Sequence, residues 1–273
     1  MVNKSLSKKQ ITKYTKHLQK NRSNYYINSL SNNSIDKLTL NNEFTQTFDN
    51  TFSNIIDTDV KPTKQGKSGR CWLFAFTNLL RLHFIKKYNL DYNFQLSQNY
   101  LFFYDKLEKC QYFLQIMYKK KDKDITSQSI KYFFDKPITD GGFWNMACNL
   151  IKKYGIVPKT NMRDTFQSSN TKKLNFFLNM NLREFSFIIR KNNFTQDEFQ
   201  TFLEKKMLII YKILVFFLGT PPKTFTWNYY TKDKKEKKTI KNLTPKLFYK
   251  KFIDFNPDDY IILTNFPLKR FPY

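Results

Sequence analysis

Residues 72–85 are apolar on nearly every side of a predicted helix, and this stretch constrains the fold more than any other. A helix that is hydrophobic all round is stable only where other elements cover it on every side. The chain has 273 residues and 41% hydrophobic content, which is enough for one large domain or two small ones. We therefore expect residues 72–85 to form the central helix of a core.

The character of the chain changes around this helix. Residues 1–60 are polar, and apart from one weak amphipathic helix near 6–20 we expect them to form an N-terminal arm. Residues 61–218 have apolar positions at helical spacing, so they predict a mainly helical domain. Its further helices are expected over 98–120, 142–154 and 196–218.

Two kinds of local signal mark the ends of these helices. Thr195 with Glu198 is a capping-box pattern in front of the helix at 196–218. Gly155 and Gly219 stand where the last two helices should stop, because glycine is the common residue just past a helix end.

Residues 219–273 have more strand character. The segments 224–230 and 259–266 read as strands, separated by a basic turn and by a short helix that begins at Thr244 and Pro245. The sequence thus predicts an α+β fold, in which a helical domain is followed by the opening strands and helix of an incomplete second domain.

The formal net charge of +25 leaves two interpretations open. Clustered lysines and arginines bind nucleic acid by neutralising phosphates. The lysines here are instead scattered among many Asn, Phe, Tyr and Ile residues, which a biased codon usage also produces. The densest run, KDKKEKK at 232–238, is equally explained as a solvated loop.

The cysteines and the apolar runs indicate the cellular compartment in which the chain is expected. Cys71, Cys110 and Cys148 are an odd number at wide spacing, which is typical of a reduced, cytoplasmic chain. No C-x-x-C pair is present and there are only two histidines, so we expect no metal and no cofactor. The N-terminus lacks a secretory signal. The most apolar run, 207–218, is broken by Lys212 and is too short to span a bilayer, so we expect a buried helix there and no membrane partner.

The stretch QGKSGRCWLF, residues 65–74, places Cys71 at the first turn of the central helix. A cysteine attacks as its thiolate, and the N-terminus of a helix favours negative charge. Gln65, in the preceding loop, is placed to donate an amide N–H to an oxyanion that forms during attack on a carbonyl. The alternative is an ordinary buried cysteine, which is the commoner fate of this residue.

Four segments together extend the pattern: QGKSGRCWLFAFTNLLR, LSQNYLFFYDKLEKCQYFLQ, TDGGFWNMACNLIKKYGIVPK and LGTPPKTFTWNYY. In this order they resemble the bleomycin hydrolase and aminopeptidase C family of papain-like cysteine peptidases. The resemblance covers roughly residues 60–273, and all six glycines of the chain lie in this region.

The resemblance implies a papain-like fold, cytoplasmic aminopeptidase activity on peptide substrates, and ring-shaped homo-oligomers. It implies that Cys71 is the nucleophile and Gln65 the oxyanion-hole glutamine, and that Gly141 and Gly142 line the substrate cleft. One departure is Phe143, which stands where the family usually has a glutamine, so the polarity of the cleft is expected to differ there.

The family's catalytic histidine and its orienting asparagine lie in a later portion that has no counterpart in this sequence. His83 follows Cys71 by twelve residues on the same predicted helix, which is about 18 Å at 1.5 Å per residue. His17 lies in the polar arm, and Asn265 precedes the family's missing segment. We therefore expect a truncated chain that by itself is weak or inactive, because no general base serves Cys71.

Three functions follow from these observations. The chain is the N-terminal portion of a cysteine aminopeptidase, acting with a separately encoded C-terminal half or as a fragment. Alternatively it is a non-catalytic descendant that serves in assembly or peptide binding. The third candidate is a basic nucleic-acid-binding protein, for which the sequence contains no recognised motif.

Overall fold

The computed structural model describes residues 5–20, 24–49, 51–55, 60, 63–233, 236–253 and 255–261. The chain divides into two compact units, Met1–Asp57 and Thr58–Tyr273. Each unit is described by itself. Among the described helices, none is long and apolar enough to cross a membrane.

The first unit consists of short helices without a core. They are α1 (Lys8–Lys20), α2 (Asn24–Asn32), α3 (Ile35–Leu38) and α4 (Asn42–Thr47). No side chain described in this unit is buried. The helix predicted near 6–20 is confirmed as α1, and the other three were missed because their Ser- and Asn-rich segments lack a clear apolar period.

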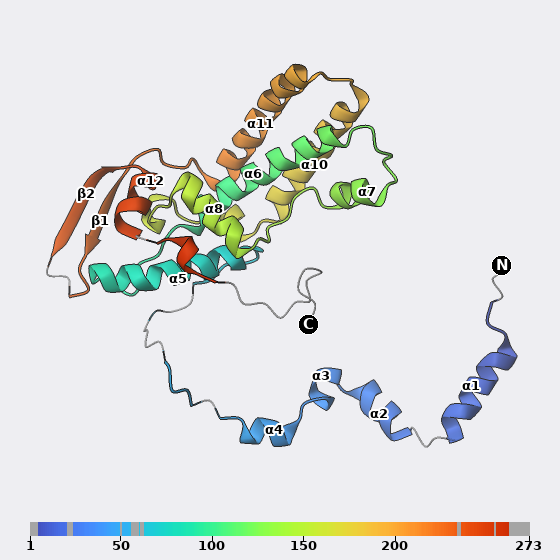
Figure 1. Ribbon diagram of the computed structural model, residues 1–273. Helices are drawn as coiled ribbons and strands as arrows, with labels where there is room; N and C mark the ends of the chain where they lie inside the picture. Colours follow the sequence, from blue (N-terminus) through green and yellow to red (C-terminus); the bar gives the residue numbers. More distant parts are fainter. Residues whose placement is uncertain are drawn as a thin grey trace. The chain divides into compact units, whose positions relative to one another are not determined.

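The second unit is mainly helical with one β-hairpin (Figure 1). Its longer helices are α5 (Cys71–Tyr88), α6 (Gln98–Lys119), α7 (Gln128–Asp135), α8 (Trp144–Tyr154), α10 (Lys172–Lys191) and α11 (Gln196–Leu218). The shorter ones are η1 (Lys159–Asn161), α9 (Phe166–Ser169), α12 (Pro245–Phe248), the π-helical η2 (Tyr249–Ile253) and η3 (Pro257–Asp259).

Helix α6 is the common neighbour of α5, α8, α10 and α11. Helices α10 and α11 pack on it and on each other, and α5 and α8 contact it from the remaining sides (Figure 1). One face of α5 is buried along the length of the helix, with Leu73, Phe76 and Phe84 among its core residues. The expected covering on every side is wrong, since Ala75 and His83 are exposed. The helices predicted over 98–120, 142–154 and 196–218 are confirmed.

The ends of α11 follow the sequence signals. Thr195 and Glu198 form the predicted capping box, and Gly219 follows the helix with φ of +86°, a value that favours glycine. The expected burial of this helix holds for one face only. Leu203, Ile210 and other residues of that face are buried, whereas Phe216 on the opposite face is 82% exposed.

The strands differ from the prediction in one respect. β1 (Phe225–Tyr230) confirms the strand expected at 224–230, but its antiparallel partner is β2 (Lys237–Leu243). The strand predicted at 259–266 is wrong over 259–261, and residues 262–266 lie outside the described part of the chain. β2 exposes most of its side chains, so its sequence contains no apolar alternation to reveal it.

The hairpin and the segment after it share the core of the helices. Trp227 of β1 is fully buried and stacks on Phe84 of α5, and Phe248 of α12 packs against both rings. The helix predicted at Thr244 and Pro245 is α12, with the Thr244 side chain as its N-cap. Residues 63–253 therefore surround a single hydrophobic core.

Candidate functional site

Cys71 is the first residue of α5 and is exposed. The residue before it, Arg70, makes no side-chain cap to the helix, so its side chain does not occupy the backbone N–H groups at this helix end. Such an end favours a negatively charged group. The other two cysteines, Cys110 and Cys148, are buried, and burial raises the pKa of Cys110 to about 12.

The loop before Cys71 is closed on itself. The Gln65 Nε2 donates to the carbonyl oxygen of Ser68 at 2.8 Å, and the Ser68 hydroxyl donates back to the carbonyl oxygen of Gln65 at 2.7 Å. Gly66 has φ of +68°, and a Cβ at this position would lie 2.6 Å from the carbonyl oxygen of Ser169. The loop thus holds the Gln65 amide in place, with its second N–H making no hydrogen bond to the described residues.

The buried side chain of Arg70 holds this loop in place. It is fully buried, and its Nε donates to the hydroxyl of Ser68 at 3.0 Å while its Nη1 pairs with Asp164 at 2.8 Å. A buried charge requires such pairing. Burial would raise the pKa of Asp164, but hydrogen bonds from Arg70 and Lys159 and the charges of both residues hold it below its ordinary value.

The glycine pair lies next to the Cys71 turn. The Trp72 Nε1 donates to the carbonyl oxygen of Asp140 at 2.8 Å, and the Gly69 N–H donates to the Asp140 carboxylate at 3.1 Å. A Cβ on Gly142 would lie 2.6 Å from the Trp72 indole, whereas nothing lies within 4 Å of one on Gly141. The structure therefore places Asp140 and Gly142 against the predicted nucleophile turn.

Asp140 is the centre of a buried polar network that the sequence did not reveal. Its carboxylate pairs with the fully buried Lys106 at 2.7 Å and accepts hydrogen bonds from Thr171 and Asn175. Burial opposes ionisation, but the charge of Lys106 and these hydrogen bonds hold the pKa of Asp140 well below its ordinary range. The network fixes the position of the segment that leads into the glycine pair.

Lys109 adds a second connection to the same segment. Its Nζ donates to the carbonyl oxygens of Gly141 at 2.7 Å and Thr139 at 3.1 Å, and it pairs with Asp105 at 2.8 Å. It also lies over the Trp72 ring, 5.5 Å from the ring centroid. In the sequence, neither Lys106 nor Lys109 stands out from the other lysines.

No imidazole lies near Cys71 among the described residues of the second unit. Its only histidine, His83, is exposed and lies on α5 about 18 Å from Cys71 at 1.5 Å per residue. His17 belongs to α1 in the other unit, and Asn265 lies outside the described residues. Phe143 precedes α8 and is 79% exposed.

A fold with the thiol at the head of a central helix and a glycine pair beside it defines a papain-like α+β protein. The sequence profile of the Peptidase C1-like family matches residues 5–273, and the chain belongs to this family. The match begins earlier than the motifs indicated, since the resemblance at 60–273 left out the arm. The arm contains no chemically distinctive motif, so only the match to the full family profile shows that the arm belongs to the family.

Relatives with this similarity include three named peptidases. Aminopeptidase C of Listeria innocua is 40% identical over 245 residues, which is 90% of this chain and 55% of the relative. Bleomycin hydrolase of Mus musculus is 37% identical over 232 residues, covering 81% and 50% of the two chains. Cysteine proteinase 1, mitochondrial, of Saccharomyces cerevisiae is 40% identical over 255 residues, covering 89% and 52%.

A solved structure shows the same fold. The crystal structure of PepW from Lactobacillus rhamnosis HN001 superposes with a TM-score of 0.85 at 33% identity, covering 94% of this chain and 58% of PepW. The chain spans about half the length of the curated relatives it matches.

The glycine pair offers a matched test of this geometry. We expect Gly142→Ala to lower the free energy of unfolding by about 1–3 kcal/mol, because its methyl group overlaps the Trp72 indole. Gly141→Ala is the control and should stay within about 0.5 kcal/mol of wild type, because its methyl group enters open space. Urea unfolding with tryptophan fluorescence measures both, and equal losses would contradict the contact.

Asp140 gives a prediction that depends on pH. Asp140→Asn leaves the Lys106 ammonium buried without its carboxylate, so we expect a loss of about 3 kcal/mol at pH 7. The folded-state pKa of Asp140 lies below the unfolded value of about 3.9. Its stabilisation is therefore complete above that pH and is lost as the pH falls toward the folded-state pKa.

The difference between wild type and Asp140→Asn should accordingly shrink when unfolding is measured at pH 3. Asp135→Asn serves as the control, because Asp135 is exposed and forms no side-chain ion pair among the described residues. A difference that stays constant between pH 7 and pH 3 would show that the charge of Asp140 does not stabilise the fold.

Proposed function

We propose that this chain provides the nucleophile-bearing part of a cysteine aminopeptidase that acts on peptides. The observation that supports this most directly is the placement of exposed Cys71 at the head of α5, between the loop of Gln65 and the glycine pair. The names of its relatives, Aminopeptidase C and Bleomycin hydrolase, agree with this assignment.

In this proposal Cys71 attacks the carbonyl carbon of the peptide bond through its sulfur. The bond between sulfur and carbon forms as the carbonyl π bond opens, and its electron pair moves to the oxygen. The second N–H of the Gln65 amide, with the backbone at the start of α5, stabilises that oxyanion. Gly141 and Gly142 allow the substrate backbone to approach, since they present no side chain.

Collapse of this intermediate expels the amine, which needs a proton from a general acid. An imidazole beside the thiol would first accept the thiol proton and then deliver it to the amine. The residues described around Cys71 provide none. We therefore propose that the base comes from another segment or another polypeptide, and that the 273-residue chain by itself is a weak peptidase.

The proposal also covers the binding partners of the chain and its cellular location. A complex with a separately encoded C-terminal half would supply the missing group, and a homo-oligomer is the other assembly that we propose. We propose a cytoplasmic location on the basis of the three unpaired cysteines, although the name of the yeast relative places that protein in the mitochondrion. A nucleic-acid partner for the +25 charge stays a prediction.

A peptide-directed electrophile tests the nucleophile assignment. We expect an aminoacyl chloromethyl ketone with a free α-amino group to modify Cys71, and to do so at least about tenfold faster than iodoacetamide does, because binding beside the glycines adds to reactivity. Peptide mapping by mass spectrometry gives the site and rate. The buried Cys110 and Cys148 are internal controls.

The variants for this experiment are Cys71→Ser, which should abolish the modification, and Gly141→Ala, which should slow only the peptide-directed reagent. A reaction at Cys71 no faster than that of iodoacetamide would favour the non-catalytic alternative, in which the fold serves assembly or peptide binding.

The weakness of the isolated chain is a separate expectation. Hydrolysis of an aminoacyl fluorogenic substrate should have a kcat/KM lower by at least about a thousandfold than that of Listeria innocua Aminopeptidase C, because the loss of one triad member costs orders of magnitude. A value within tenfold of the relative would mean that a base is already present in this chain.

A further inference from the structure

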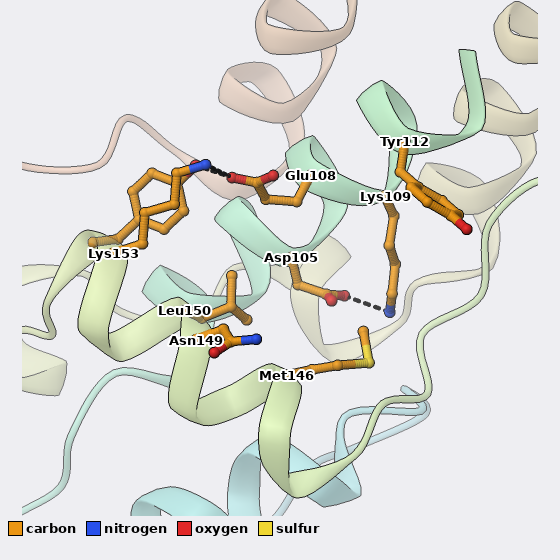
Figure 2. A pocket seen from close by; sticks show the side chains of 9 residues that line it. Asp105, Glu108, Lys109, Tyr112, Met146, Asn149, Leu150 and Lys153 are labelled. Atoms are coloured by element: carbon orange, nitrogen blue, oxygen red, sulfur yellow. Dashed lines mark hydrogen bonds and ion pairs between the residues drawn. The ribbon is translucent and has the colours of Figure 1, made fainter. Parts of the chain in front are cut away.

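Helices α6 and α8 line an open cavity of about 310 Å³ on the side of α6 that also bears Lys109 (Figure 2). Met146 and Leu150 of α8 and Tyr112 of α6 give it apolar walls. Asp105 and Glu108 of α6 supply its carboxylates. Nothing in the proposed peptidase chemistry uses this cavity.

The hydrogen bonds around the cavity leave acceptors unused. The Oδ2 of Asp105 accepts from Lys109 at 2.8 Å, whereas its Oδ1 accepts no hydrogen bond from the described residues. Glu108 is similar, since its Oε1 accepts from Lys153 and Tyr154 and its Oε2 from none of the described residues. Figure 2 shows both lysines directed at these carboxylates. Each carboxylate therefore has one oxygen to which no described residue donates, and the amide of Asn149 lines the same cavity.

Asp105 has the stronger need for a donor. Its side chain is 2% exposed, and an ionised carboxylate so deeply buried is costly unless both oxygens are satisfied. Burial raises the pKa of Asp105 to about 6, although Lys109 acts in the opposite direction. Asp105 lines the cavity, and its Oδ1 is the oxygen to which no described residue donates.

We propose that the cavity between α6 and α8 binds a compact organic cation, a primary ammonium on an apolar body, with the ammonium on Oδ1 of Asp105. The apolar body would contact Met146, Leu150 and Tyr112. An anion is disfavoured because Lys109 and Lys153 already donate to carboxylates. The overall positive charge of the chain has little influence at this range, since charges beyond about 8 Å are screened at physiological salt.

Occupancy of the cavity would reach the glycine pair through Lys109. This ammonium is shared between Asp105 and the carbonyl oxygens of Gly141 and Thr139. A cation on Oδ1 shares the carboxylate charge with Lys109 on Oδ2, so Lys109 depends more on its remaining bonds, including that to Gly141. Binding itself is independent of the proposed peptidase function, and only the effect on substrate rests on it.

Benzylamine is the probe, with benzyl alcohol and benzoate as the neutral and anionic controls of similar shape. Calorimetric titration of the full chain at pH 7.5 gives the affinity. We expect benzylamine to bind at least tenfold more tightly than either control. In amide NMR spectra, the signals of Gly141 and Gly142 should shift with benzylamine and not with benzoate. No binding at about 10 mM benzylamine would overturn the proposal.

Two variants locate the site. Asp105→Asn keeps an oxygen for Lys109 but loses the carboxylate charge, and should weaken benzylamine at least tenfold. Met146→Trp fills the cavity from its half-buried rim and should abolish binding. Asp135→Asn and Met180→Trp are matched controls at exposed positions outside the cavity.

Unchanged affinity in Met146→Trp would overturn the proposal, as would unchanged affinity in a folded Asp105→Asn. If Asp105→Asn fails to fold by circular dichroism, Met146→Trp decides the question. The rate at which the aminoacyl chloromethyl ketone modifies Cys71 separates this result from the proposed function. A failure to bind benzylamine leaves that rate unaffected.

Discussion

The carboxylate of Asp140 joins the two parts of the candidate site. It accepts the Gly69 N–H from the loop in front of Cys71, while its own backbone carbonyl accepts the Trp72 indole N–H just behind Cys71. The buried ammonium of Lys106 keeps the carboxylate ionised. Because a buried ion pair is costly to break, this arrangement fixes the nucleophile turn against the glycine pair.

A second buried charge supports the other end of the same turn. Arg70 connects the loop of Gln65 to Asp164, so the residues on both sides of Cys71 are held by ion pairs rather than by apolar contacts alone. Polar networks of this kind specify one geometry when every member is satisfied. The exposed thiol is thus presented by a rigid frame, while Cys71 itself remains accessible.

The sequence was sufficient for helices α5, α6, α8 and α11, and it singled out the residues of the Cys71 turn, whose roles stay predictions. These features have local signals, namely apolar periodicity, caps, and glycines next to a cysteine. Asp140, Lys106 and Arg70 have none, because a charged residue looks the same in sequence whether it is solvated or buried in an ion pair. β2 was missed because its sequence has no apolar alternation. Its strand conformation depends on pairing with β1, which the local sequence does not reveal.

The central claim is that the Cys71 turn and the glycine pair form one peptide-binding surface. A crystal structure of the chain after reaction with the aminoacyl chloromethyl ketone tests it most directly. We predict that the ligand backbone lies along Gly141 and Gly142, with its oxygen about 2.7–3.1 Å from the Gln65 amide nitrogen. A ligand joined to Cys71 that extends away from both glycines, with Gln65 still bonded only to Ser68, would contradict the account.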